Sequence, residues 1–91
     1  MRERIKDYLG CDEKRAAYTE EKLSRIDERL KPILDRWLKD GTESSDDMFH
    51  GYSINLLMRR YRMKFTGAIL TLDWIVKDPV CAQEALKYGI R

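Results

Sequence analysis

The chain has 91 residues and a formal net charge of +2 at pH 7. Hydrophobic residues make up 43% and charged residues 37%, with only 5 glycines and 2 prolines, which excludes collagen-like, linker and low-complexity proteins. A chain of this size buries one modest core, so we expect a single domain over residues 1–91. No apolar run approaches the roughly 20 residues of a membrane span, and the charged first residues lack the apolar centre of a signal peptide. We therefore expect a cytoplasmic protein without contact to a membrane.

The first helical signals lie before the middle of the chain. Residues 2–9 predict a short helix that ends at Gly10, and Asp12 is a candidate N-cap for a long amphipathic helix over 12–31. Both signs of charge cover the outer face of this long helix. We expect it either to dimerise the protein, giving a homodimer, or to brace the core.

A further helix is expected over 32–40, ending at Gly41. Pro32 sets the boundary, as a kink or a break, because its ring removes a backbone donor and clashes with the preceding turn. The apolar stripe that predicts these helices recurs at steps of three and four residues. It consists of Leu23, Ile26, Leu30, Ile33, Leu34, Trp37 and Leu38.

The second half predicts a helix-turn-helix-like layout. Residues 42–47 are small, polar and acidic and predict a loop. A helix capped by Ser53, a turn of about four residues and a second helix from about Phe65 follow, with Thr66 able to cap the second helix. Asp78 is a candidate cap for a last helix that ends at Gly89.

No alternating strand pattern is present, so the predicted fold is all-α. We expect a small helical domain with a helix-turn-helix-like trihelical core preceded by a long amphipathic helix. Its parts are an N-terminal helical extension (1–31), the core (32–78) and a C-terminal helix (79–91).

Charge is distributed unevenly along the chain. Residues 1–50 carry a net charge of −2 and residues 51–91 a net charge of +4. A dense positive cluster attracts phosphate or an acidic protein surface, although a solvated basic helix face has the same composition. The cluster consists of Arg59, Arg60, Arg62 and Lys64, with no acid among them.

The segment 53–73 resembles the helix-turn-helix of the winged-helix gamma domain of FtsK-type DNA translocases. The resemblance implies a fold that recognises short DNA sequences through its second helix, with the three arginines of the cluster as phosphate-contact candidates. Lys64 replaces the turn glycine of that family, and residues 78–87 predict a helix where the family has a wing. The shared residues are Ser53, Leu56, Leu57, Arg59, Arg60, Tyr61, Arg62, Met63, Phe65, Ala68 and Asp73.

Catalytic and metal-binding motifs are missing from the sequence. It has no phosphate-binding glycine loop and no nucleophile elbow, and its one histidine, His50, is most simply a loop residue. Cys11 and Cys81 are too few soft ligands for a structural zinc site, and we expect two reduced thiols. We expect no enzyme, no catalytic residue, no cofactor, no metal and no small-molecule substrate.

Two functions therefore remain open. The first is a small DNA-binding protein, such as a phage or mobile-element regulator. Its basic face would hold the DNA backbone through Arg59, Arg60, Arg62 and Lys64, while Thr66 and Thr71 face the groove. The second is a protein-interaction module, such as a phage-encoded inhibitor of a host defence enzyme. Its partner would bind the acidic loop or an apolar patch formed by Leu70 and Trp74.

Overall fold

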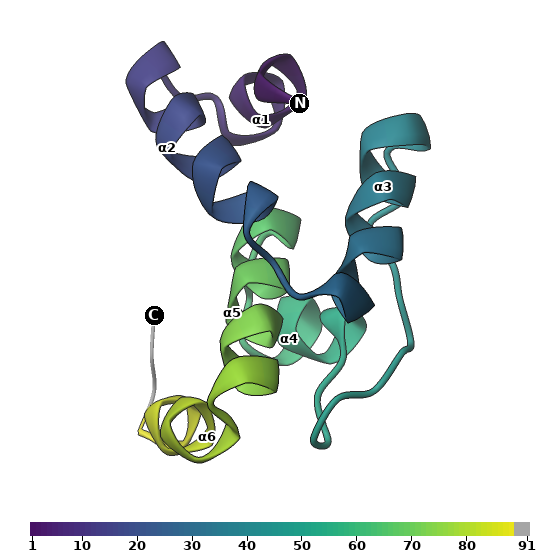
Figure 1. Ribbon diagram of the computed structural model, residues 1–91, viewed down its shortest axis with the longest axis vertical. Coiled ribbons are helices and arrows are strands. Elements are labelled where there is room, and N and C mark those ends of the chain that lie inside the picture. The colour runs from purple at the N-terminus through teal and green to yellow at the C-terminus, as the bar shows by residue number, and fades with distance from the viewer. Residues whose placement is uncertain (89–91) are drawn as a thin grey trace.

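The structure, a computed structural model, describes residues 1–88 and is all-α, as predicted (Figure 1). Within these residues the only strand-like pairing is an isolated antiparallel bridge between Phe49 and Tyr52. None of the helices described is long and apolar enough to cross a bilayer. In chain order the elements are α1 (Arg2–Leu9), α2 (Glu13–Ser24), the 3-10 helix η1 (Glu28–Leu30), α3 (Lys31–Asp40), α4 (Ile54–Arg60), α5 (Phe65–Lys77) and α6 (Pro79–Lys87).

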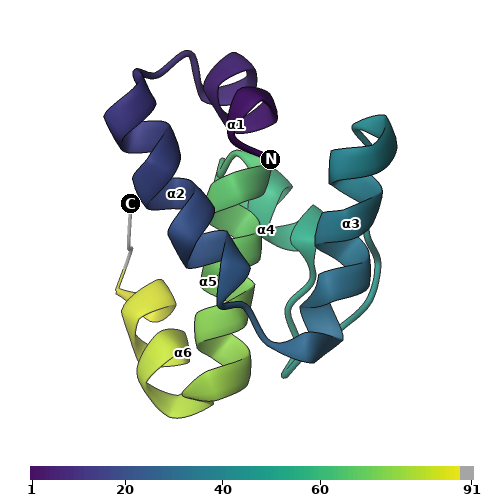
Figure 2. The ribbon, with the colours of Figure 1, turned by 45° about the horizontal axis from the view of Figure 1, so that its top comes forward.

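Helix α5 occupies the centre of the molecule. It lies between α2 and α6 on one side and α3 and α4 on the other (Figure 2). Seven of its 13 residues are buried, because it carries apolar side chains on most of its circumference. The second helix of the predicted helix-turn-helix is therefore the core helix of the whole fold.

The predicted helix over 12–31 is wrong in its C-terminal part. Helix α2 ends at Ser24, an irregular linker covers residues 25–27, and η1 precedes α3. The break is made by a tertiary contact, because the backbone N–H of Asp27 donates a hydrogen bond to the Asp73 carboxylate on α5 at 2.8 Å. Pro32 marks the start of the next helix, as one of the two predicted alternatives had it, but α2 ends well before it. Pro32 lies in the first turn of α3, where its missing N–H costs no helical hydrogen bond.

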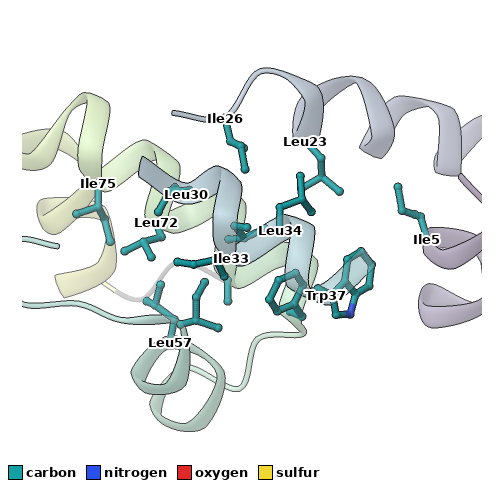
Figure 3. Close-up of a cluster of buried hydrophobic side chains, with 14 of the residues drawn as sticks. Ile5, Leu23, Ile26, Leu30, Ile33, Leu34, Trp37, Leu57, Leu72 and Ile75 are labelled. Carbon is teal, nitrogen blue, oxygen red and sulfur yellow. The ribbon is translucent and has the colours of Figure 1, made fainter. Parts of the chain in front are cut away.

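The apolar stripe is buried as predicted, although three separate elements and the linker supply it. Ile33, Leu57 and Leu72 come from three different helices and meet in one cluster (Figure 3). Trp37 stacks on Phe65 with ring centroids 4.8 Å apart and joins α3 to the start of α5. Of the stripe residues, only Leu38 is partly exposed.

The apolar side of the long helix, which was expected either to dimerise the protein or to brace the core, is buried inside the chain. Leu23, Ile26 and Leu30 are at most 3% exposed and belong to the central cluster. They are not free to pair with a second copy. The N-terminal helices instead contribute to the core that α5 organises.

Local capping signals explain most of the helix ends. The side chains of Asp12, Ser53 and Asp78 accept hydrogen bonds from the backbone of α2, α4 and α6, as predicted. Gly10 and Gly41 end α1 and α3 in the left-handed conformation. Thr66 was predicted to cap α5. This is wrong, because α5 begins at Phe65 and Thr66 lies inside the helix. Gly89, the predicted end of the last helix, lies outside the described residues.

Candidate nucleic-acid interface

The basic turn (residues 59–64) comprises the end of α4 and the connection to α5. Buried Ile54 and Leu57 attach α4 to the core, so Arg59 and Arg60 in its last turn are exposed. A four-residue connection, 61–64, then leads from α4 to α5.

Arg62 makes the bend between the two helices. Its φ angle of 55° lies in the left-handed region, which costs about 1–2 kcal/mol for a residue with a Cβ. The family resemblance placed the turn glycine at Lys64, but Lys64 has an extended backbone with φ −75° and ψ 164° and precedes α5. The strained position of the turn is therefore two residues earlier than expected, at an exposed arginine.

The cations of the basic turn form no ion pairs with carboxylates of residues 1–88. Arg59, Arg60, Arg62 and Lys64 are all exposed. The density of cations sets this turn apart, because exposed Lys14, Arg15, Lys39 and Lys87 also lack an ion pair within residues 1–88. Several other cations are paired with carboxylates at 2.5–3.1 Å. Those are Arg2, Lys6, Arg25, Arg29 and Lys77.

One side of the basic turn borders the acidic loop. A shallow hollow of about 270 Å³ beside Arg59 is lined by Glu43, Ser44, Asn55 and Met58. The side-chain amide of Asn55 donates a hydrogen bond to Asp46, which holds the loop against α4. The positive surface is thus limited on the side of Arg59.

A tyrosine from α1 holds the start of α5 in place. The Tyr8 hydroxyl accepts a hydrogen bond from the backbone N–H of Phe65 at 2.7 Å and donates one to Glu43 at 2.9 Å. Burial raises the pKa of this hydroxyl above its ordinary value. The ammonium of Lys64 lies 5.7 Å from the centre of the same ring. Tyr8 therefore positions the end of the basic turn.

The two threonines predicted to face DNA are poorly placed to do so. Thr66 is only 4% exposed, so its expected position toward a groove is wrong. The reason is that α1 and α3 cover the start of α5 through Tyr8 and Trp37. Thr71 is partly exposed, and its hydroxyl donates a hydrogen bond to the carbonyl of Gly67 in its own helix at 2.7 Å.

The apolar patch predicted at Leu70 and Trp74 differs in composition. Both side chains are partly buried against the core. Leu70 lines a groove of about 410 Å³ between α2 and α5, together with Asp73 and with Tyr18. Tyr18 is 63% exposed, and its position outside the apolar stripe of α2 was the signal that the sequence interpretation overlooked. Trp74 is not among the residues that line this groove.

The other candidate chemical groups are dispersed. His50 is exposed in a tight turn and makes no side-chain hydrogen bond within residues 1–88. Cys11 and Cys81 are free thiols, the first in the connection between α1 and α2 and the second on α6. Among the described residues, no three His, Cys, Asp or Glu side chains gather as a metal-binding group.

Comparison with known proteins finds no relative of this chain. No protein family, curated protein or solved structure matches the chain. The interpretation of the basic turn therefore depends on its own residues and contacts.

Proposed function

We propose that this protein binds DNA by holding the phosphate backbone on its basic turn. One observation carries the proposal: four exposed cations lie within six residues, and none is paired with a carboxylate of residues 1–88. When such a cluster neutralises DNA phosphates, the cations condensed on the DNA are released, which gives affinity without sequence reading. The resemblance of residues 53–73 to the helix-turn-helix of FtsK-type gamma domains supports the same role.

The burial of the start of α5 favours binding that does not depend on base sequence. Reading bases in the major groove requires exposed donors and acceptors on the inserted helix. Phe65 and Thr66 are at most 4% exposed, and the partly exposed residues of α5 are Gly67, Leu70, Thr71, Asp73 and Trp74. The two polar side chains among them are already bonded within the protein, Thr71 to Gly67 and Asp73 to Asp27 and Lys77. The proposed contact is therefore with phosphates, through Arg59, Arg60, Arg62 and Lys64.

The test compares two double variants with the same loss of charge. Fluorescence anisotropy with a labelled DNA at low salt measures the affinity of wild type, of Arg59→Ala/Arg60→Ala and of Arg25→Ala/Arg29→Ala. Arg25 and Arg29 are exposed but are paired with Glu21 and Asp27. We expect the first variant to bind more weakly and its salt slope to fall by about one per lost contact, with little change in the control. Equal losses in both variants, or no binding by wild type, would contradict the proposal.

A second candidate function is a protein interaction at the groove between α2 and α5. Tyr18, at 63% exposure beside Leu70, is the observation that favours it. Immobilised protein would then retain a partner that Tyr18→Ala loses and Arg59→Ala/Arg60→Ala keeps. The opposite pattern of loss would argue against this groove.

A further inference from the structure

We infer that the nucleic acid held by the basic turn is single-stranded, with the ring of Tyr61 stacking on an unpaired base. The inference rests on the proposed function and specifies its ligand. Sequence-tolerant binding of single strands combines a basic surface that follows the backbone with aromatic rings that stack on bases. Both features meet at this turn.

Tyr61 lies where such a ring is needed. It follows the last residue of α4 and stands between Arg60 and Arg62, both of which are exposed. Its side chain is partly buried against the core, which holds the ring, and partly accessible. A strand whose phosphates contact the two arginines would therefore bring its bases to Tyr61.

A second tyrosine supports the first. The rings of Tyr52 and Tyr61 have centroids 6.5 Å apart and an interplanar angle of 44°. Tyr52 is fixed by a tight turn in which its backbone exchanges two hydrogen bonds with Phe49, at 2.7 and 3.0 Å. His50 and Gly51 form the tip of that turn with positive φ angles of 50° and 86°. The aromatic pair is thus built on an ordered support.

The positive charge reaches this aromatic pair. Burial raises the pKa of the Tyr52 hydroxyl, as does the neighbouring Tyr61, whereas the guanidinium of Arg60 acts to lower it. Arg60 is therefore close enough to influence the hydroxyl of Tyr52 electrostatically. The acidic loop borders the turn on the side of Arg59.

A DNA duplex would contact the arginines of the basic turn but not the tyrosine rings. Its bases are stacked on one another and present no free face to a tyrosine, so a duplex would engage the arginines alone. Helix α5 cannot compensate by entering the major groove, because Phe65 and Thr66 at its start are buried. A single strand engages both the arginines and the rings.

The experiment measures anisotropy for oligo(dT), oligo(rU) and a duplex with the same number of phosphates, all at one salt concentration. Wild type, Tyr61→Leu and Tyr61→Phe are compared, with Tyr18→Leu as the control because Tyr18 is an exposed tyrosine on α2. We expect wild type to prefer a single strand, and Tyr61→Leu to lose about tenfold in single-strand affinity. Duplex affinity should stay unchanged, and Tyr61→Phe and Tyr18→Leu should behave as wild type. A preference for oligo(rU) over oligo(dT) would support the single-strand inference but would replace DNA with RNA in the proposed function.

Equal or tighter binding of the duplex by wild type, or an unchanged preference in Tyr61→Leu, would overturn the inference. The proposed function would survive either result if Arg59→Ala/Arg60→Ala still weakened binding. No binding of any of the three nucleic acids would overturn both. Photocrosslinking of iodouracil-substituted oligonucleotide to wild-type protein keeps the test independent of the folding of Tyr61→Leu. We expect the crosslink at Tyr61 or Tyr52, and a crosslink confined to Tyr18 or Tyr88 would contradict the inference.

Discussion

Two irregular connections of this protein differ in whether their charged side chains form ion pairs within residues 1–88. They are the linker (residues 25–27), where they do, and the basic turn, where they do not. In the linker, the N–H of Asp27 donates to Asp73, and the ammonium of Lys77 donates to the carbonyl of Arg25 at 2.8 Å. In the basic turn, the anchor is the neutral hydroxyl of Tyr8 on the N–H of Phe65. Each connection thus has a backbone N–H bound by a distant side chain. Only in the linker are the charged side chains, Arg25 and Asp27, also paired within the protein, with Glu21 and Arg29.

This difference separates charges that shape the fold from charges that are available to a partner. Asp73 also pairs with Lys77 at 3.1 Å, and its side chain is only 15% exposed. The arginines of the basic turn have no carboxylate partner within residues 1–88. Mutating the linker should therefore change stability, whereas mutating the basic turn should change binding.

The largest effect is expected at the linker anchor. Asp73→Ala leaves the N–H of Asp27 without its acceptor and removes the ion pair with Lys77, so the free energy of unfolding should fall by about 2–3 kcal/mol. Urea unfolding followed by circular dichroism measures this. Asp35→Ala on the exposed face of α3 is the control and should be nearly neutral. A loss at Asp73 no larger than that of the control would remove the assigned role.

Removing the anchor of the basic turn should have the next largest effect. Tyr8→Phe keeps the ring but leaves the N–H of Phe65 unpaired in a partly buried place, at a cost of about 1–2 kcal/mol. The same unfolding experiment applies. Tyr18→Phe removes an exposed hydroxyl and should not change stability, and a smaller loss for Tyr8→Phe than for this control would contradict the anchor.

Arg62→Gly should raise the free energy of unfolding while it lowers the affinity for DNA. Glycine tolerates the φ angle of 55°, so the free energy of unfolding should rise by about 0.5 kcal/mol once the extra freedom of the unfolded chain is included. DNA affinity should fall at the same time, because a phosphate contact is lost. Arg62→Ala loses the same charge but keeps the strain, so it should weaken binding without the gain in stability. Tighter DNA binding by either variant would exclude Arg62 from the contact.

The smallest effect concerns an exposed ion pair. Lys6 and then Arg2 hold the pKa of Glu13 below its ordinary value of 4.5. A lowered folded-state pKa contributes stability at neutral pH that disappears as pH falls below the ordinary glutamate range. The Tm difference between wild type and Glu13→Gln should therefore be small at pH 7 and shrink toward zero in acid. A difference that grows in acid would reverse the assigned sign.

Much of the helical layout could be predicted because its signals are local. An N-cap such as Asp12 or Ser53 bonds to a backbone N–H three residues later, and an apolar stripe repeats within one or two turns. The density of cations in the basic turn is likewise a property of neighbouring residues. The all-α class, the start of α5 at Phe65 and most of the helix ends follow from these short-range patterns.

The tertiary structure alone decided where the long N-terminal helix breaks and which faces remain exposed. Asp73 lies far along the chain from Asp27, so no local pattern could show that their hydrogen bond ends the helical run before Pro32. Thr66 is buried, and Tyr18 lines a groove, because of helices that lie across them in space. Caps and periodicity depend on the nearest turn of chain, whereas burial depends on which distant elements pack together.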